Sequence, residues 1–160
     1  MGKLSVRESA INNRSNTLSF PMSAVPPSTL AAYHETDYCV FGEPPLVLRI
    51  GIASEALAGL YRKHGVECAA FVTACNPFSE NIGKEANATK QAELKNELQR
   101  RSLVFYEGEG RHPDGGWPAE PSFLVMGFTL ESAKSLGTRH EQNAVVWCGT
   151  DVVPQLVLLR

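Results

Sequence analysis

The chain has 160 residues, of which 43% are hydrophobic and 20% charged, and its formal net charge at pH 7 is −2. This length and composition are typical of one folded domain with a sizeable core, and they exclude a wholly disordered chain. The basic excess that most nucleic-acid-binding proteins carry is absent, so we expect no nucleic-acid partner.

The first part of the chain differs in composition from the rest. Residues 1–27 are rich in Ser, Asn, Pro and charged residues and show no apolar period. Such a segment has too little apolar surface to form a core. We therefore expect a flexible N-terminal tail over residues 1–27, followed by a single domain over residues 28–160.

The domain is expected to open with a helical turn, a hairpin and a helix. The helical turn covers residues 28–33, and short strands follow at 38–41 and 46–50. The Gly-Glu-Pro-Pro turn between the two strands predicts that they pair as a hairpin. Ser54 is a good N-cap for the next helix, and Gly65 is a good stop for it.

A short apolar run then forms the centre of the predicted sheet. Residues 68–75 are small or apolar apart from Thr73, and Asn76-Pro77 ends the run. This pattern predicts a strand covered on both faces. The run is far shorter than the about 20 apolar residues of a membrane span, so we expect no membrane association.

The end of this strand is the first candidate for a site. In open α/β sheets, ligands bind beyond the carboxyl ends of strands. Pro77 lacks an N–H group and forces the chain out of the sheet at Asn76. The corner from Thr73 to Ser79 is therefore a candidate binding site, and the alternative is a central strand that ends in an ordinary turn.

The second half of the chain alternates helices with apolar strands. We expect a long, mostly polar surface helix over residues 84–101, with a narrow apolar stripe of Ala88, Ala92 or Gln91, Leu94 and Leu98. The remaining elements are a strand at 103–106, a Gly-rich loop at 107–118, a strand at 122–127, a helix from Thr129 to Gly137, a strand at 143–148 and an edge strand at 156–159. The alternation predicts an α/β fold: a single domain with a mixed, mostly buried β-sheet flanked by helices.

Polar side chains adjoin the ends of these strands. Glu120 lies between Trp117 and an apolar strand, and burial of this kind raises the pKa of a carboxyl group, which suits a general acid or base. Glu120 is therefore the candidate catalytic residue. Amide side chains bind polar ligand edges, and an indole ring stacks on planar ligands. The candidate ligand-binding residues are Asn76, Ser79, Asn87, Trp117, Gln142 and Asn143.

Each candidate also has a structural alternative. Glu120 could pair with a lysine or cap backbone N–H groups, and this role commonly explains such residues. Gln142 and Asn143 could satisfy backbone groups at the end of a strand. Trp117 could cover the core from its Gly/Pro-rich loop.

The cysteines and histidines indicate no metal or redox site. Cys39, Cys68, Cys75 and Cys148 form no C-x-x-C pair, and three of them lie in apolar runs. We interpret them as reduced thiols of a cytoplasmic protein, with two disulfides as the alternative. The histidines lack the close spacing of a local metal site, so no metal and no cofactor are expected.

Several segments, taken together and in order, resemble a known family. These segments are A-A-Y-H-E-T-D-Y at 31–38, F-V-T-A-C-N-P-F-S at 71–79, N-A-T-K-Q-A-E-L at 87–94, W-P-A-E-P-S-F-L-V-M-G at 117–127 and L-G-T-R-H-E-Q-N-A-V-V-W at 136–147. The chain resembles the bacterial family called domain of unknown function 3293 over about residues 28–150. Relatives have a motif closer to T-A-W-N-P, so Cys75 replaces a tryptophan, which argues against a catalytic thiol.

The resemblance implies a small bacterial cytoplasmic protein and no particular reaction. Two hypotheses follow from the residues. The first is a site that binds or acts on a small polar metabolite or nucleotide. The alternative is a non-enzymatic protein-binding or regulatory module, in which the helix over residues 84–101 meets a protein partner through Lys95 and Arg100.

Overall fold

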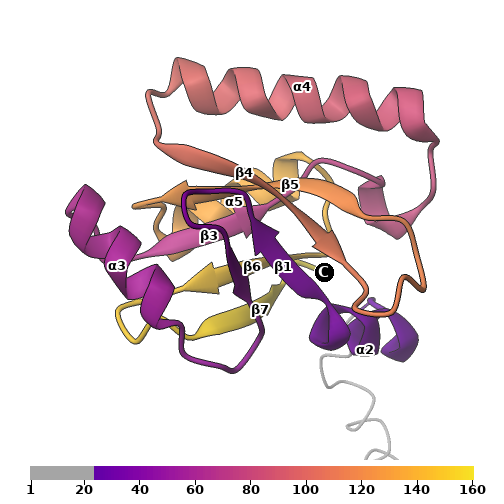
Figure 1. Ribbon diagram of the computed structural model, residues 1–160. Helices are drawn as coiled ribbons and strands as arrows, with labels where there is room; N and C mark the ends of the chain where they lie inside the picture. The colour runs from indigo at the N-terminus through magenta and orange to yellow at the C-terminus, as the bar shows by residue number, and fades with distance from the viewer. Residues whose placement is uncertain (1–23) are drawn as a thin grey trace, which may run out of the picture.

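The computed structural model describes residues 24–160, so the tail expected over residues 1–27 lies outside the described part of the chain, apart from residues 24–27. In chain order the elements are α2 (Pro27–Glu35), β1 (Asp37–Val40), β2 (Leu46–Leu48), α3 (Glu55–His64), β3 (Ala69–Val72), the 3₁₀ turn η2 (Pro77–Ser79), α4 (Lys84–Arg100), β4 (Phe105–Arg111), β5 (Glu120–Met126), α5 (Leu130–Arg139), β6 (Ala144–Cys148) and β7 (Pro154–Leu158). Figure 1 shows their arrangement.

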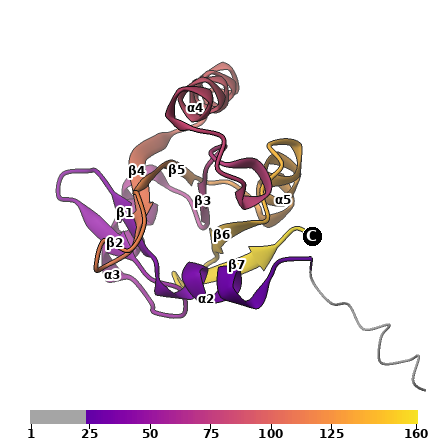
Figure 2. The same ribbon diagram turned by 90° about the vertical axis from the view of Figure 1, so that its right-hand side faces the viewer.

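The strands of this region form one seven-stranded sheet in the order β2-β1-β4-β5-β3-β6-β7. The sheet curls strongly, so that in Figure 2 the strands follow an arc from β2 over β5 to β7. Helices α4 and α5 lie outside the arc, whereas α2 and α3 lie toward its open side. The α/β class predicted from the sequence is confirmed.

The direction of the strands differs from the expected mixture. Every pair of neighbouring strands in the described region is antiparallel. The crossovers through α4 and α5 do join strands that run in the same direction, but an antiparallel strand lies between the members of each such pair. The sequence pattern of alternating helices and strands does not reveal this interleaving.

Most predicted elements are present, and the largest difference is β4. The hairpin of β1 and β2 forms with Cys39 opposite Val47, and β7 lies at an edge of the sheet as expected. However, β4 extends through residues expected to form a Gly-rich loop. Gly108 is needed there because a Cβ atom on it would lie 2.1 Å from the backbone oxygen of Cys39.

Helix ends follow the local capping signals. The Ser54 hydroxyl accepts the N–H of Leu57 at the start of α3, and Gly65 ends this helix in the left-handed conformation with φ 64°. The Thr129 hydroxyl accepts the N–H of Ser132 at the start of α5. Helix α5 continues to Arg139, past the glycine expected to end it.

Helix α4 covers the outer face of the sheet with one narrow edge. Its buried residues are Gln91, Leu94 and Leu98, whereas Ala88 and Ala92 of the expected stripe are exposed. Gln91, which was given as the alternative to Ala92, is therefore the residue that belongs to the buried stripe. Its partners, described below, explain why a polar side chain is tolerated there.

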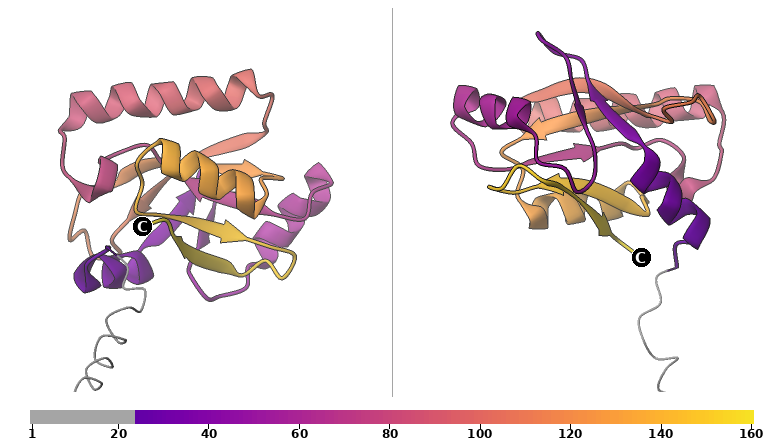
Figure 3. Two further views of the ribbon diagram at one scale, coloured as in Figure 1. Left: turned by 180° about the vertical axis from the view of Figure 1, so that it is seen from behind. Right: turned by 60° about the horizontal axis from the view of Figure 1, so that its bottom comes forward.

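Two hydrophobic clusters form the core, one on each face of the sheet. The inner cluster joins Phe71 and Leu124 to Leu57 and Tyr61 of α3. The outer cluster joins Val72, Ala70 and Val125 to residues of α4 and α5, and Figure 3 shows α5 against the sheet next to β6 and β7. Strand β3 is buried on both faces, as its unbroken apolar run predicts. None of the helices in residues 24–160 combines the length and hydrophobicity that a membrane span requires.

Candidate functional site

The antiparallel pairing brings distant segments to one end of the sheet. Val72, the last residue of β3, lies opposite Phe123 in the middle of β5, and Phe71 lies opposite Val146 in the middle of β6. Because the strands are antiparallel, the residues that follow β3 lie beside the first residues of β5 and β6 and the segments just before them. We call this end of the sheet the rim.

The chain leaves β3 at the rim through an unusual turn. Asn76, Phe78 and Ser79 all have positive φ angles, of 46°, 53° and 63°. Asparagine adopts this conformation more readily than most residues, but phenylalanine does so at a cost of about 1–3 kcal/mol. The N–H of Phe78 donates to the backbone oxygen of Glu141 at 2.7 Å, which anchors the turn to the segment before β6.

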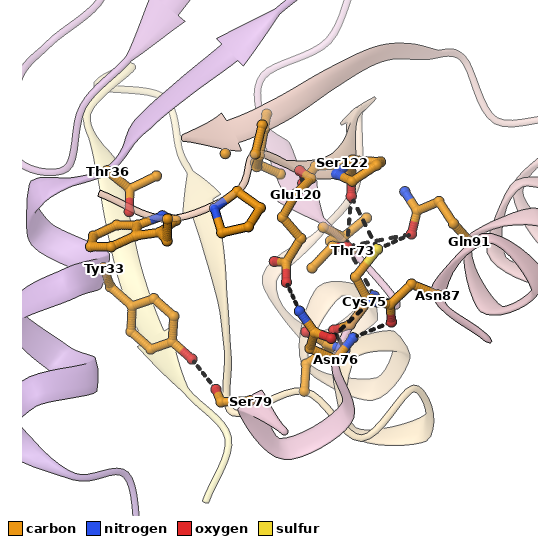
Figure 4. A pocket seen from close by; sticks show the side chains of 18 of the residues that line it. Tyr33, Thr36, Thr73, Cys75, Asn76, Ser79, Asn87, Gln91, Glu120 and Ser122 are labelled. Atoms are coloured by element: carbon orange, nitrogen blue, oxygen red, sulfur yellow. Dashed lines mark hydrogen bonds between the residues drawn. The ribbon is translucent and has the colours of Figure 1, made fainter. Parts of the chain in front are cut away.

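Asn76 is the centre of a hydrogen-bond network that includes α4 and β5 (Figure 4). Its backbone N–H donates to Asn87 Oδ1 at 2.7 Å, and Asn87 Nδ2 donates back to Asn76 Oδ1 at 2.7 Å. Its own Nδ2 donates to Glu120 Oε2 at 3.1 Å. The structure thus places three residues named from the sequence in direct contact, although they come from three separate segments.

The carboxyl group of Glu120 has an unusually high pKa. Burial raises its pKa from 4.5 to about 7, and the hydrogen bond from Asn76 opposes this rise only in part. A carboxyl group of this pKa exchanges its proton near neutral pH, which is the property required of a general acid or base. Its second oxygen, Oε1, has no hydrogen-bond partner among the described residues.

Gln142 and Asn143 lie at the start of β6 and differ in their positions. The Nε2 group of Gln142 donates to the backbone oxygens of Cys75, at 3.1 Å, and His140, at 3.2 Å. The Nδ2 group of Asn143 donates to Ser79 Oγ at 2.7 Å. Gln142 therefore satisfies backbone groups, as in the alternative given for it, whereas Asn143 bonds the side chain of Ser79.

Trp117 lies in the loop between β4 and β5, where His112 supports it. The two rings meet edge to face with centroids 4.2 Å apart. His112 Nδ1 accepts the backbone N–H groups of Asp114 and Gly116, both at 3.1 Å, so this loop has a defined shape. His112 Nε2 also lies 3.6 Å from Glu35, which connects the loop to α2.

A cavity of about 980 Å³ opens at the rim, and most of the candidate residues line it. These residues are Asn76, Ser79, Asn87, Trp117, Glu120 and Gln142. Asn143 is not among the lining residues, although both of its neighbours in the sequence are. The volume is within the range of sites for small molecules.

Sequence reasoning missed part of the wall. Tyr33 of α2, Tyr38 of β1 and Phe71 of β3 add aromatic surface, and Lys84 and Gln91 belong to α4. The two tyrosines lie in the segment A-A-Y-H-E-T-D-Y, so the resemblance contained a signal for them. For Gln91 the signal was its spacing, because it lies one helical turn after Asn87 on the same face.

Gln91 forms a second polar cluster beside the first. Its Oε1 accepts the backbone N–H of Ala74 at 3.0 Å and the hydroxyl of Thr73 at 3.4 Å. Thr73 Oγ1 also lies 2.7 Å from the backbone oxygen of Pro121. The Nε2 group of Gln91 is the one fully buried side-chain polar atom in the described residues without a hydrogen-bond partner.

The cysteines of the site do not favour nucleophilic chemistry. All four cysteines lie in the described region and are free. Burial raises the pKa of the Cys75 thiol, which lowers the fraction of reactive thiolate. Within residues 24–160 no cluster of three or more His, Cys, Asp and Glu side chains is arranged to hold a metal ion.

The comparisons with known proteins give a match to one family, whose function is unknown. Residues 72–145 match the model of the family described as protein of unknown function (DUF3293). No curated protein and no solved structure gives a significant match. The matched segment runs from the end of β3 to the start of β6, so it contains every candidate site residue named from the sequence.

Proposed function

We propose that this chain, which belongs to the DUF3293 family of proteins of unknown function, binds a small polar metabolite or nucleotide in the cavity at its rim. The observation that carries the proposal is the convergence of Asn76, Glu120 and Gln142 on one cavity from three separate segments. A cavity with mostly apolar walls and a few convergent polar groups is the usual form of a small-molecule site.

Glu120 supports an extension of this proposal from binding to chemistry. It and Lys84 are the only ionisable acid or base side chains, tyrosine and cysteine aside, among the described residues that line the cavity. The raised pKa of Glu120, about 7, matches a proton transfer at neutral pH. Glu120 is therefore our candidate acid or base for a reaction of the bound ligand.

The alternative of a protein-binding module has less support. It depends on α4 meeting a partner through Lys95 and Arg100. Lys95 Nζ already binds Glu107 Oε2 of β4 at 2.8 Å within the chain, so Lys95 has a role within this fold. We therefore propose the small-molecule site alone.

A thermal-shift screen against nucleotides and polar metabolites tests the proposal. We expect at least one compound to raise the melting temperature by about 5–10 °C at a concentration near 100 times its Kd. Glu120→Gln and Gln142→Ala should reduce this shift, because both side chains line the cavity. Glu131→Gln is the control, since Glu131 is exposed in the first turn of α5 and does not line the cavity.

Two results would count against the proposal. One is that no compound stabilises the wild-type protein. The other is that a stabilising compound shifts the cavity variants as much as the control, which would place its binding elsewhere.

A further inference from the structure

The cavity contains two hydrogen-bond acceptors that nothing in the described chain uses. Asn76 occupies Oε2 of Glu120 and leaves Oε1 without a partner. Gln142 donates twice through Nε2, to Cys75 and His140, which leaves its Oε1 without a partner. Gln142 is only 8% exposed.

Both free oxygens remain accessible. Every fully buried side-chain polar atom in residues 24–160 has a partner except Nε2 of Gln91. The unpartnered Oε1 atoms of Glu120 and Gln142 are therefore not sealed in the core, and both residues line the cavity. A ligand that fills the cavity separates these acceptors from water, so it binds well only if it donates hydrogen bonds to them in return.

The walls around these acceptors favour a flat ligand. Trp117, Tyr33, Tyr38 and Phe71 line the same cavity. The Trp117 ring is held in place by its contact with His112, so little freedom is lost when a planar ring stacks on it. The apolar walls and the acceptors together match a ring that carries N–H groups on one edge.

The charges limit the ligand further. Glu120 is the one acidic side chain among the described lining residues, and Lys84, the first residue of α4, is exposed. An anionic group is disfavoured next to Glu120. A ribose or phosphate on the ligand would instead extend toward solvent, which the volume of about 980 Å³ allows.

We infer that the cavity binds an amino-substituted nitrogen heterocycle, as the free base, nucleoside or nucleotide, with its amino edge toward Glu120 and Gln142. This inference rests on the proposed small-molecule function and names the class of ligand. The amino N–H groups donate to the two free oxygens, and the ring lies among the aromatic side chains.

Matched nucleoside pairs test the inference by isothermal titration calorimetry. Guanosine and inosine differ in one amino group alone, whereas inosine and uridine replace the amino group of adenosine and cytidine by a carbonyl oxygen and carry an N–H group on the adjacent ring nitrogen. We expect the amino member of at least one pair to bind about tenfold more tightly than its partner, because its amino group donates a charge-assisted hydrogen bond to Glu120.

Two variants separate the contribution of the edge from that of the ring. Glu120→Gln should reduce the ratio of affinities within the pair toward one, because the amide binds an amino group less strongly than a carboxylate. Trp117→Ala should weaken both members by a similar factor, because both rings stack equally. Glu131→Gln should change neither quantity, and circular dichroism checks that each variant is folded.

The possible failures are distinguishable. Equal binding of both members of every pair, or an unchanged ratio in Glu120→Gln, overturns the inference but leaves the proposed function intact. The same holds if no nucleoside binds while another metabolite from the screen binds in a manner that depends on Glu120. Absence of any ligand overturns both.

Discussion

At the scale of single residues, Glu120 makes the stability of the fold depend on pH. Its pKa is about 7 in the folded protein against 4.5 in the absence of burial. The folded protein therefore keeps a proton that the unfolded chain releases as the pH rises from 4.5 to 7. Because the unfolded state then binds fewer protons, the free energy of unfolding falls over this range by about 3 kcal/mol from this group.

Glu120→Gln should remove this dependence. A glutamine has no proton to lose, and its side-chain oxygen still accepts from Asn76. The free energy of unfolding of the variant, relative to wild type, should rise by about 3 kcal/mol between pH 4.5 and pH 8 and stay constant above that. Urea denaturation at a series of pH values measures the difference. A difference that is independent of pH would contradict the raised pKa.

Some residues of the candidate site were predictable from the sequence, but the contacts between them were not. Glu120 was predictable because a carboxylate beside Trp117 and an apolar strand is expected to lose water. The pairing of Asn76 with Asn87 was not, because it depends on where α4 is placed after the turn. Asn143 was named from its position before β6, but it does not line the cavity itself and instead bonds Ser79, which does.

At the scale of elements, the ends of α4 and α5 are joined by Glu97. Both of its oxygens bind the guanidinium group of Arg139, at 3.2 and 2.8 Å, and Oε1 lies 3.0 Å from His140 Nε2. The hydrogen bonds from Arg139 are the largest cause that lowers the pKa of Glu97, to about 2. The side chain is 14% exposed, so solvent screens these interactions less than at the surface.

Glu97→Gln should therefore destabilise the protein more at neutral pH than in acid. A carboxyl group with a lowered pKa stabilises the fold above pH 4.5, and this contribution is lost as the pH falls toward 2. We expect a cost of about 1–2 kcal/mol at pH 7, since partial exposure reduces the value of an ion pair. Glu93→Gln, an exposed position one turn earlier on α4, serves as the control.

Thermal or urea unfolding of Glu97→Gln and Glu93→Gln at pH 7 and pH 3 measures how much unfolding free energy each variant loses at each pH. An equal cost at both pH values would show that Glu97 acts through packing rather than charge.

The element boundaries that the sequence predicted well are those with a local signal, such as Ser54 and Gly65 around α3. It predicted the end of α5 less well, because Gly137 lies within the helix near Val145 and Leu159 and does not end it.

At the scale of the whole molecule, the sheet is continuous only because β4 passes close to β1. The hairpin of β1 and β2 meets the rest of the sheet through β4 alone. Glycines in β4 read as a loop signal in the sequence, yet Gly108 is required by this close approach. The glycine at position 108 was a real signal, but it reflects a contact between strands in the folded protein and not a local turn.

Gly108→Ala should loosen this connection. Its Cβ atom would lie 2.1 Å from the Cys39 oxygen, and backbone atoms cannot move away without separating the strands. We expect a loss of about 3 kcal/mol in the free energy of unfolding. Gly110→Ala is the matched control on the same strand, because its nearest contact would be 3.4 Å from a Thr36 side-chain atom. Equal stabilities of the two variants would refute the steric argument.

A site at the rim was predicted from a rule for parallel sheets, but the sheet that forms the rim is antiparallel. The expectation came from sheets in which all strands end on one side. In the actual sheet, β3 ends beside the first halves of its antiparallel neighbours β5 and β6, so the chain that follows β3 reaches the segments that precede those strands. Segments at both ends of strands were named from the sequence, which is why the candidates include Asn76, Glu120 and Gln142, three residues that line one cavity.

The position of β3 also governs the order in which the molecule can assemble. This strand is made early in the chain, yet Phe71 pairs with Leu124 on one side and Val146 on the other. Tyr61 likewise hydrogen-bonds the backbone of Cys148, 87 residues later. Such distant pairings require closure of long loops before they become favourable, which slows folding. During synthesis, β3 therefore lacks both of its neighbouring strands until first β5 and then β6 have left the ribosome.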